Sequence, residues 1–220
     1  MAKKWSDMVR RGEGVQVEFK RQCPKLKRLS RTLSAFSNSS GGTIFMGIDD
    51  EGEIVGLENA KGTLELVQQV SGFYCDPPVK IKADFWEPMK GVNVLVVQVP
   101  EAALKPVYAV DPNRSDDKWP YFRSDRENLP LDRKSLKNMS KVTSEPVEDH
   151  VGELDKTELR ILDNLDTHPR QTLGQIAKSI NVSTHRAKRI LVGLEQRGWV
   201  HAFFNEKRRE YSLAVVWKRR

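Results

Sequence analysis

The stretch "LSAFSNSSGGTIFMGIDDEGEIVGLE", residues 33–58, predicts a helix end, a strand and a sharp turn in quick succession. Four apolar residues at spacings of three and four form one stripe of that helix, namely Leu26, Leu29, Leu33 and Phe36. Residues 38–42, which include Gly41 and Gly42, end the helix. "TIFMGIDDEGEIVGLE" then runs through a turn at residues 50–52 and predicts a β-hairpin.

Further elements on both sides of this stretch complete a mixed domain. Ser6 can cap a short helix that ends at Gly12, and a strand follows over residues 14–20. The pattern further along predicts a helix, a hairpin, two short strands and a closing helix, within residues 64–73, 79–100, 103–110, 119–124 and 131–140. Hairpins mixed with helices indicate an α+β domain, which we place at residues 1–142.

A polar segment without periodicity, residues 143–152, is the predicted linker to a second domain at residues 153–220. "DKTE" and "TLGQ" are capping-box patterns that open helices at Asp155 and Thr172, and Ser183 can cap a third helix. An alternating hairpin follows the third helix. Three short helices and a hairpin are the plan of the winged helix-turn-helix family, which this domain resembles.

The positive charge of the chain is concentrated in this second domain. The 220 residues carry a formal net charge of +7. Residues 151–220 hold 14 Lys and Arg against 8 Asp and Glu, a net of +6, whereas residues 1–150 hold 23 against 22, a net of +1. A regional surplus of cations indicates a polyanionic partner, most often nucleic acid, although a solubilising surface is an alternative.

The N-terminal segment "MAKKWSDMVRR" lacks the apolar region of a secretory signal, and no apolar run approaches the roughly 18 residues that span a membrane. We therefore expect a cytoplasmic protein with no membrane partner. The two cysteines, Cys23 and Cys75, have neither the spacing of a zinc site nor the pattern of a disulfide framework.

The third helix of the second domain carries the predicted nucleic-acid contacts. Its core stripe centres near Ala187 and Leu191, which leaves a polar outer face. Arg, Lys and Gln side chains on such a face can reach bases and phosphates in a DNA major groove. The predicted contacts are His185, Arg186, Lys188 and Arg189 on the helix, and Lys207, Arg208 and Arg209 at the hairpin tip. Winged helices also dimerise or dock other proteins, and this alternative stays open.

Three stretches of the first domain carry a resemblance to a known family. They are "GEGVQVEFK", the stretch at residues 33–58, and "KPVY" with "YFRSDR" further on. In this order they resemble the Schlafen/AlbA-type domain, over residues 8–135. The resemblance implies a DNA-binding domain of the kind that bacterial transcriptional-regulator-like proteins join to a winged helix. In the family a Gly usually comes soon after the Arg of the last motif, whereas here Ser124 and Asp125 follow Arg123.

The resemblance also implies an alternative function, because nuclease-active Schlafen proteins use three carboxylates. The matching positions here are Glu13, Glu18 and Asp50, and the lysine of the "EFK" motif is Lys20. Three acidic oxygens would hold Mg²⁺ or Mn²⁺, and the lysine would neutralise a scissile phosphate. Glu13 and Glu18 face opposite sides of a straight strand, so the site requires Glu13 to fold back from a turn, which its neighbouring glycines allow. Otherwise Glu18 and Lys20 form an ion pair on a solvated strand face.

Several other polar residues of the first domain invite a functional interpretation. Lys27, Arg28 and Arg31 lie on the solvent side of the first long helix, where they either follow a nucleic-acid backbone or form a solvated face. No GxxxxGK[ST] motif accompanies the paired glycines, so we do not expect ATP use. Asn38 is predicted to cap the helix end rather than to act as a catalytic amide.

The residues and the resemblance together predict a nucleic-acid-binding protein, in the first place a DNA-binding transcriptional regulator that needs no cofactor for binding. DNA is the expected partner and RNA the alternative. A metal-dependent nuclease that uses Mg or Mn is the second hypothesis, and a winged-helix dimerisation module is the third. A homodimer would suit palindromic DNA.

Overall fold

The computed structural model describes residues 2–131, 154–205 and 208–214. It divides into two compact units, Met1–Ala102 with Val107–Asn128, and Ala103–Pro106 with Leu129–Arg220. The predicted linker, and the predicted helix at residues 131–140 beyond its first residue, lie outside the described residues. Among the described residues, no helix combines the length and the apolar character needed to cross a membrane.

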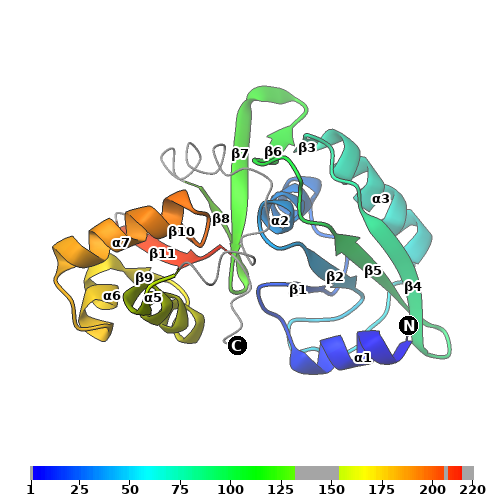
Figure 1. Ribbon diagram of the computed structural model, residues 1–220. Helices are drawn as coiled ribbons and strands as arrows, with labels where there is room; N and C mark the ends of the chain where they lie inside the picture. Colours follow the sequence, from blue (N-terminus) through cyan, green and yellow to red (C-terminus); the bar gives the residue numbers. More distant parts are fainter. Residues whose placement is uncertain (1, 132–153, 206–207, 215–220) are drawn as a thin grey trace. The chain divides into compact units, whose positions relative to one another are not determined.

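The first unit mixes helices with strands in the predicted α+β manner (Figure 1). Its helices are α1 (Ala2–Arg11), α2 (Leu26–Asn38) and α3 (Ala60–Phe73). Its strands are β1 (Val17–Lys20), β2 (Gly42–Met46), β3 (Cys75–Asp76), β4 (Lys82–Met89), β5 (Val92–Val99), β6 (Tyr108–Asp111), β7 (Arg114–Ser124) and the first half of β8 (Glu127–Pro130), whose last two residues fall in the second unit. The predicted helix at residues 64–73 and the hairpin of β4 and β5 are therefore confirmed.

Two four-stranded sheets organise this unit. The first has the strand order β1-β2-β5-β4, in which β1 and β2 are parallel and the other pairs are antiparallel. Helix α2 is the crossover between the parallel strands β1 and β2, as a parallel pair requires. The second sheet has the order β3-β6-β7-β8. Helix α2 contacts both β6 and β7, and thus links the two sheets.

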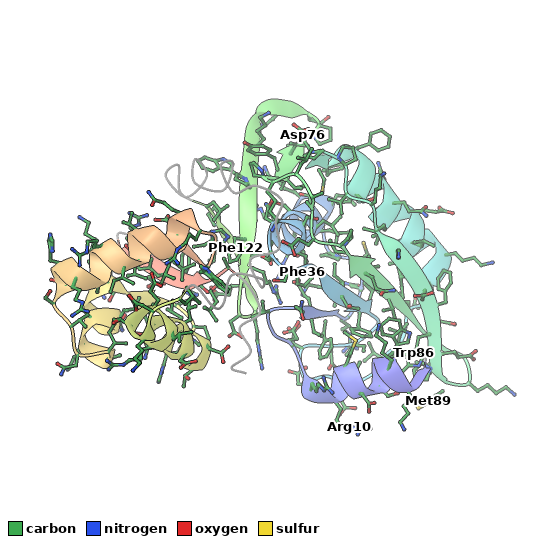
Figure 2. The ribbon with its side chains drawn as sticks, in the orientation of Figure 1. Arg10, Phe36, Asp76, Trp86, Met89 and Phe122 are labelled. Carbon is green, nitrogen blue, oxygen red and sulfur yellow. The ribbon has the colours of Figure 1, made fainter. Side chains whose placement is uncertain are left out.

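The first sheet is buried on both faces. Successive residues of β2 and β5 point to opposite sides of the sheet, and both sets of side chains are packed against helices. One face packs with α2 and α3 through Ile44, Met46, Leu95 and Val97. The other face packs with Trp5 of α1 through Phe19, Phe45, Trp86, Val94 and Val96. The Phe45 ring makes edge contacts with Trp5 and Trp86, at centroid distances of 6.0 and 6.3 Å (Figure 2 labels Trp86).

The hairpin predicted over residues 43–58 is wrong in its return strand. The turn forms where expected, with the Gly52 N–H donating to the Asp49 carbonyl at 3.1 Å. The return, however, is reduced to one bridge between Ile48 and Ile54. The physical reason is the position of β2, whose two edges are already paired with β1 and β5, so that no edge remains for a third strand.

Two local predictions at helix ends have different outcomes. The first helix begins at Ala2, so Ser6 lies inside it and is not its cap, whereas Gly12 ends it with a φ of +80°. At the end of α2, Gly41 has a φ of +70°, and a Cβ on Gly42 would lie 2.6 Å from the Phe36 ring. The paired glycines are thus explained by a helix-terminating turn and close packing.

The second unit has the predicted helices and an additional strand. Its elements are α5 (Lys156–Thr167), β9 (Gln171–Thr172), α6 (Leu173–Ser179), α7 (Thr184–Gln196), β10 (Val200–Asn205) and β11 (Arg208–Leu213). Both capping boxes form, at Asp155 with Glu158 and at Thr172 with Gln175. The strand missed by the sequence is β9, which pairs with β11 at only two positions and completes the sheet β10-β11-β9. This arrangement is a winged helix.

Candidate nucleic-acid interface

Helix α7 presents its predicted cationic face to solvent. The Ser183 side chain accepts a hydrogen bond from the Arg186 backbone N–H and caps the helix. The opposite face enters the core of the winged helix through Ala187, Leu191 and Leu194, all of them fully buried. The exposed residues of α7 include four that carry or can acquire positive charge, namely His185, Arg186, Lys188 and Arg189. Four side chains that carry or can acquire positive charge therefore lie together on one solvent-facing surface, which we call the α7 face.

The connection between α6 and α7 is short and tightly held. Asn181 adopts a φ of +54°, a left-handed conformation that Asn tolerates better than most residues. The Val182 backbone N–H then donates to the Ala177 carbonyl at 3.0 Å. This turn fixes the direction in which α7 leaves α6, as a helix-turn-helix requires.

The predicted contacts at the hairpin tip do not share one environment. Arg208 is exposed, and Lys207 lies outside the described residues. Arg209 instead pairs with Glu195 of α7, at 3.2 and 3.3 Å from its two carboxylate oxygens, and lies over the Tyr211 ring. Because Glu195 is almost fully buried, Arg209 balances an internal charge rather than extending the cationic surface.

In the first unit, Glu13 folds back, which was the condition that the three-carboxylate hypothesis set. Its Oε1 atom accepts a hydrogen bond from the Phe19 backbone N–H at 2.6 Å. Glu13 lies between Gly12, which has a left-handed conformation, and a tight turn in which the Gly14 N–H donates to the Val17 carbonyl. The Glu13 carboxylate thus holds the start of β1.

Glu18 is buried and its carboxylate is fully engaged by the chain itself. Its side chain is 5% exposed, and its Oε2 atom accepts a bond from Arg123 Nη1 at 2.6 Å. Its Oε1 atom lies 2.8 Å from Lys20 Nζ and accepts a bond from Thr32 Oγ1 at 3.3 Å. The expected Glu18–Lys20 pair therefore exists, but inside the domain rather than on a solvated face. Lys20 also donates to the Phe19 carbonyl at 2.6 Å.

Arg123 of the "YFRSDR" motif is the centre of this arrangement. Its side chain is completely buried and donates to the Gly14 and Val17 carbonyls, at 3.0 and 3.3 Å, as well as to Glu18. Its guanidinium also lies 5.0 Å from the ring of Phe36, which Figure 2 labels. Burial lowers the pKa of Arg123, while the charges of Glu18 and Glu13 oppose that effect. Arg123 thus ties β7 to the loop before β1.

The contacts of Glu13, Glu18 and Asp50 bear on whether these three carboxylates can bind one metal ion together. Asp50 is exposed, both oxygens of Glu18 are bound by protein groups, and Oε1 of Glu13 accepts from the Phe19 N–H. Among the described residues, no group of three or more His, Cys, Asp or Glu side chains could hold a metal ion. The ligand set Glu13, Glu18 and Asp50 is therefore not assembled, and the buried cation beside Glu18 is Arg123. Among the described residues this geometry offers Mg²⁺ or Mn²⁺ no group of three carboxylates, and nuclease activity itself stays a prediction.

Asn38 is not the helix cap that the sequence predicted. It is buried, and its amide bonds both backbone groups of Val107, accepting from the N–H at 2.7 Å and donating to the carbonyl at 2.8 Å. It also donates to the Tyr121 carbonyl at 2.8 Å. Ser34, one turn earlier, donates to the Val107 carbonyl and accepts from the Tyr121 N–H. These polar residues fasten α2 to β7, and their i, i+4 spacing was the signal that sequence reasoning missed.

The basic residues of α2 are exposed as predicted. Lys27, Arg28 and Arg31 all face solvent. Lys27 Nζ lies 3.7 Å from an oxygen of Asp111, and the Arg31 guanidinium lies 5.4 Å from the Tyr121 ring centroid. The cations thus border the second sheet.

Comparison with known proteins agrees with both units. The family described as Schlafen, AlbA_2 matches residues 13–132, more than half of the chain. The chain belongs to the Schlafen AlbA_2 family. The MarR family matches residues 154–206, the winged helix that follows the AlbA_2 domain. Both families indicate nucleic-acid binding.

The other comparisons add little to this assignment. No curated protein matches the chain. A crystal structure of the DIP2311 protein from Corynebacterium diphtheriae matches at 19% identity and a TM-score of 0.43. The match covers 69% of this chain but only 29% of that chain, and it supports no argument about function.

The departure of this chain from the usual AlbA_2 motif has a structural explanation. Asp125, two residues after Arg123, has a φ of +52°, in the left-handed region where glycine is favoured. Aspartate is one of the few other residues that adopt this conformation as single residues. Asp125 therefore makes the turn between β7 and β8, and its charge also favours the protonated form of Arg123.

Proposed function

We propose that this chain is a DNA-binding transcriptional regulator whose winged helix grips duplex DNA. In this proposal α7 enters the major groove, and Arg208 lies beside the neighbouring phosphate backbone. The α7 face is the observation that carries the proposal, because His185, Arg186, Lys188 and Arg189 are all exposed on a helix that Ser183 caps and the core holds rigidly. The match to the MarR family supports the same assignment.

The test is duplex binding by the full chain and by a variant that carries Arg186→Gln and Arg189→Gln. Genomic fragments enriched by the wild-type protein provide the duplex, and fluorescence anisotropy at several salt concentrations measures the affinity. Each lost base contact should weaken binding by about 1–3 kcal/mol, and each lost phosphate contact should reduce the salt slope by about 1. The matched control is Arg160→Gln, because Arg160 is an exposed arginine on α5.

The outcome separates the proposal from its competitors. Equal affinities for the double variant and the control would remove α7 from the interface. A chain that binds no duplex at low salt but binds another protein would favour the docking module. Enriched fragments upstream of genes, together with altered transcription of a reporter that carries them, would establish the regulatory role.

Homodimerisation is a further part of the proposal. A two-fold pair would place two α7 helices on half-sites about one helical turn apart, so the enriched sequence should be a palindrome with that spacing. Light scattering of the free chain and of its complex with DNA measures the stoichiometry. A single chain on a site without symmetry would overturn this part alone.

A further inference from the structure

A shallow hollow in the AlbA_2 domain lies between α2 and the second sheet. Its lining includes Lys27, Ser30 and Arg31 from α2, Ala109 from β6, and Trp119 and Tyr121 from β7. We call it the α2–β7 hollow. None of these side chains takes part in the Glu18–Arg123 cluster or in the α7 face. Its lining combines two aromatic rings with two cations, a composition that the duplex-binding proposal does not explain.

Trp119 is the main apolar feature of the α2–β7 hollow. It is 47% exposed, although a Trp side chain gains more than most from burial. Its partner across the strand pair is Ala109, whose methyl group is too small to cover an indole ring. Nearly half of the Trp119 surface is thus open to solvent beside a polar and basic helix.

At the rim of the hollow a positively charged side chain lies against an aromatic ring. Arg31 lies over the Tyr121 ring at 5.4 Å, within the range of a cation–π contact. Lys27 lies one turn of α2 before Arg31 and shares its charge with Asp111 at 3.7 Å. Arg31 is consequently the stronger candidate for an external anion, and Lys27 adds to the local positive potential.

The hollow is also preorganised. The backbone of Tyr121 is fixed to α2 by two hydrogen bonds, from its N–H to Ser34 Oγ at 3.0 Å and from Asn38 Nδ2 to its carbonyl at 2.8 Å. The strand that carries both rings therefore keeps its position against the helix that carries both cations. A ligand that bridges ring and cation would lose little of its binding free energy to ordering the site.

We propose that the α2–β7 hollow binds an unpaired nucleotide of a single-stranded nucleic acid. The base stacks on Trp119, and the adjacent phosphate binds Arg31 with support from Lys27. Aromatic platforms beside backbone-tracking cations are the chemistry by which proteins hold single strands. Bases inside a duplex have their faces covered by neighbouring base pairs, so this site goes beyond the duplex binding proposed for α7. DNA and RNA single strands share the required chemistry.

The experiment measures anisotropy of fluorescein-labelled DNA and RNA oligomers of about twelve nucleotides, against an oligomer of equal length in which abasic sites replace the bases. The full chain is used, in the background of Arg186→Gln and Arg189→Gln. Trp119→Ala should weaken binding of the base-containing oligomers about tenfold or more, whereas Trp119→Phe should retain most of the affinity. Phe85→Ala is the matched control, because Phe85 is a 51% exposed aromatic residue on β4 outside the hollow.

The phosphate contact has its own control. Arg31→Gln should reduce the salt slope for single strands by about 0.7, the contribution of one phosphate. Arg10→Gln should leave the slope unchanged, because Arg10 lies on α1 and outside the hollow (Figure 2). The DNA and RNA oligomers, compared at equal length, show which sugar the hollow accepts.

Two results would overturn the inference. One is equal affinity of Trp119→Ala and the parent chain for base-containing oligomers, and the other is binding of the abasic oligomer as tightly as the base-containing one. Duplex titrations of the same variants keep this test separate from the proposed function. Trp119→Ala should leave duplex affinity unchanged in the chain with an intact α7 face. If the chain with an intact α7 face bound single strands but no duplex, the winged-helix proposal would be contradicted and the inference about the hollow would not.

Discussion

Glu18 on β1 and Arg189 on α7 are both charged, and each belongs to a cluster of charges that the sequence marks as a candidate site. Glu18 is buried, and it binds Arg123, Lys20 and Thr32. Arg189 is exposed on the outer side of a helix whose other side is core. The first cluster is satisfied internally and holds the AlbA_2 domain together. The second faces solvent, where a ligand can reach it. Burial and partners, rather than residue type, separate a structural cluster from a binding surface.

The largest expected effect that tests this comparison is at Arg123. Arg123→Met should destabilise the fold by about 3–5 kcal/mol, because it leaves the Glu18 carboxylate buried without its closest cation. Urea unfolding followed by circular dichroism measures the change. The control is Arg21→Gln, which removes the exposed Arg21 side chain from its pair with Asp49 at 3.7 Å and should change stability by about 0–1 kcal/mol. If the two variants lose equal stability, the Glu18 cluster is not structural.

Asn38 gives the next largest expected effect. Asn38→Ala should destabilise the fold by about 2–4 kcal/mol, because it removes the side-chain partner of the Val107 N–H and of the Tyr121 carbonyl and leaves Ser34 as the side-chain donor to the Val107 carbonyl. Thermal and urea unfolding measure this loss. Asn59→Ala is the comparison within the same domain, because Asn59 only caps α3 through the Gly62 N–H and its loss should be about 1 kcal/mol. A smaller effect at Asn38 than at Asn59 would contradict its role in fastening α2 to β7.

Arg208 and Arg209, neighbours on β11, allow a buried and an exposed charge to be compared within one domain. Arg209→Gln should lower the free energy of unfolding by about 1–3 kcal/mol, since it removes the ion pair and the two hydrogen bonds that Arg209 makes with buried Glu195. Arg208→Gln should leave stability within about 0.5 kcal/mol and reduce the salt slope of duplex binding by about 1. Unfolding and anisotropy are measured on both variants. A loss of stability in Arg208→Gln and a loss of salt slope in Arg209→Gln would contradict the roles assigned to these two residues.

The smallest expected effect concerns metal. Mn²⁺ or Mg²⁺ should produce neither cleavage of labelled RNA or DNA nor a shift of the unfolding midpoint, because the carboxylates of Glu13 and Glu18 bond protein donors and Asp50 is exposed. Parallel incubations with EDTA and with Glu18→Ala provide the reference. Cleavage that requires the metal and disappears in the variant would reinstate the three-carboxylate site.

Much of the fold could be predicted from local patterns. The apolar stripe of α2, both capping boxes of the winged helix and the cationic outer face of α7 all appear in the sequence, since each depends on residues within one or two helical turns. The flanking glycines allowed a bend at Glu13, but the sequence predicted that bend only as a condition of the three-carboxylate site. The loss of the return strand after Gly52 could not be predicted locally, because it depends on β1 and β5, which occupy the two edges of β2.

The sequence by itself determined which helices form, which face of α7 is polar, and the family to which the longer domain belongs. The tertiary structure alone decided the meaning of the charged residues. Arg123 lies 105 residues from Glu18 along the chain, and Asn38 lies 69 residues from Val107, so no local pattern relates them. A carboxylate becomes a metal ligand or half of a buried ion pair according to the cation that folding brings beside it, and here that cation is Arg123.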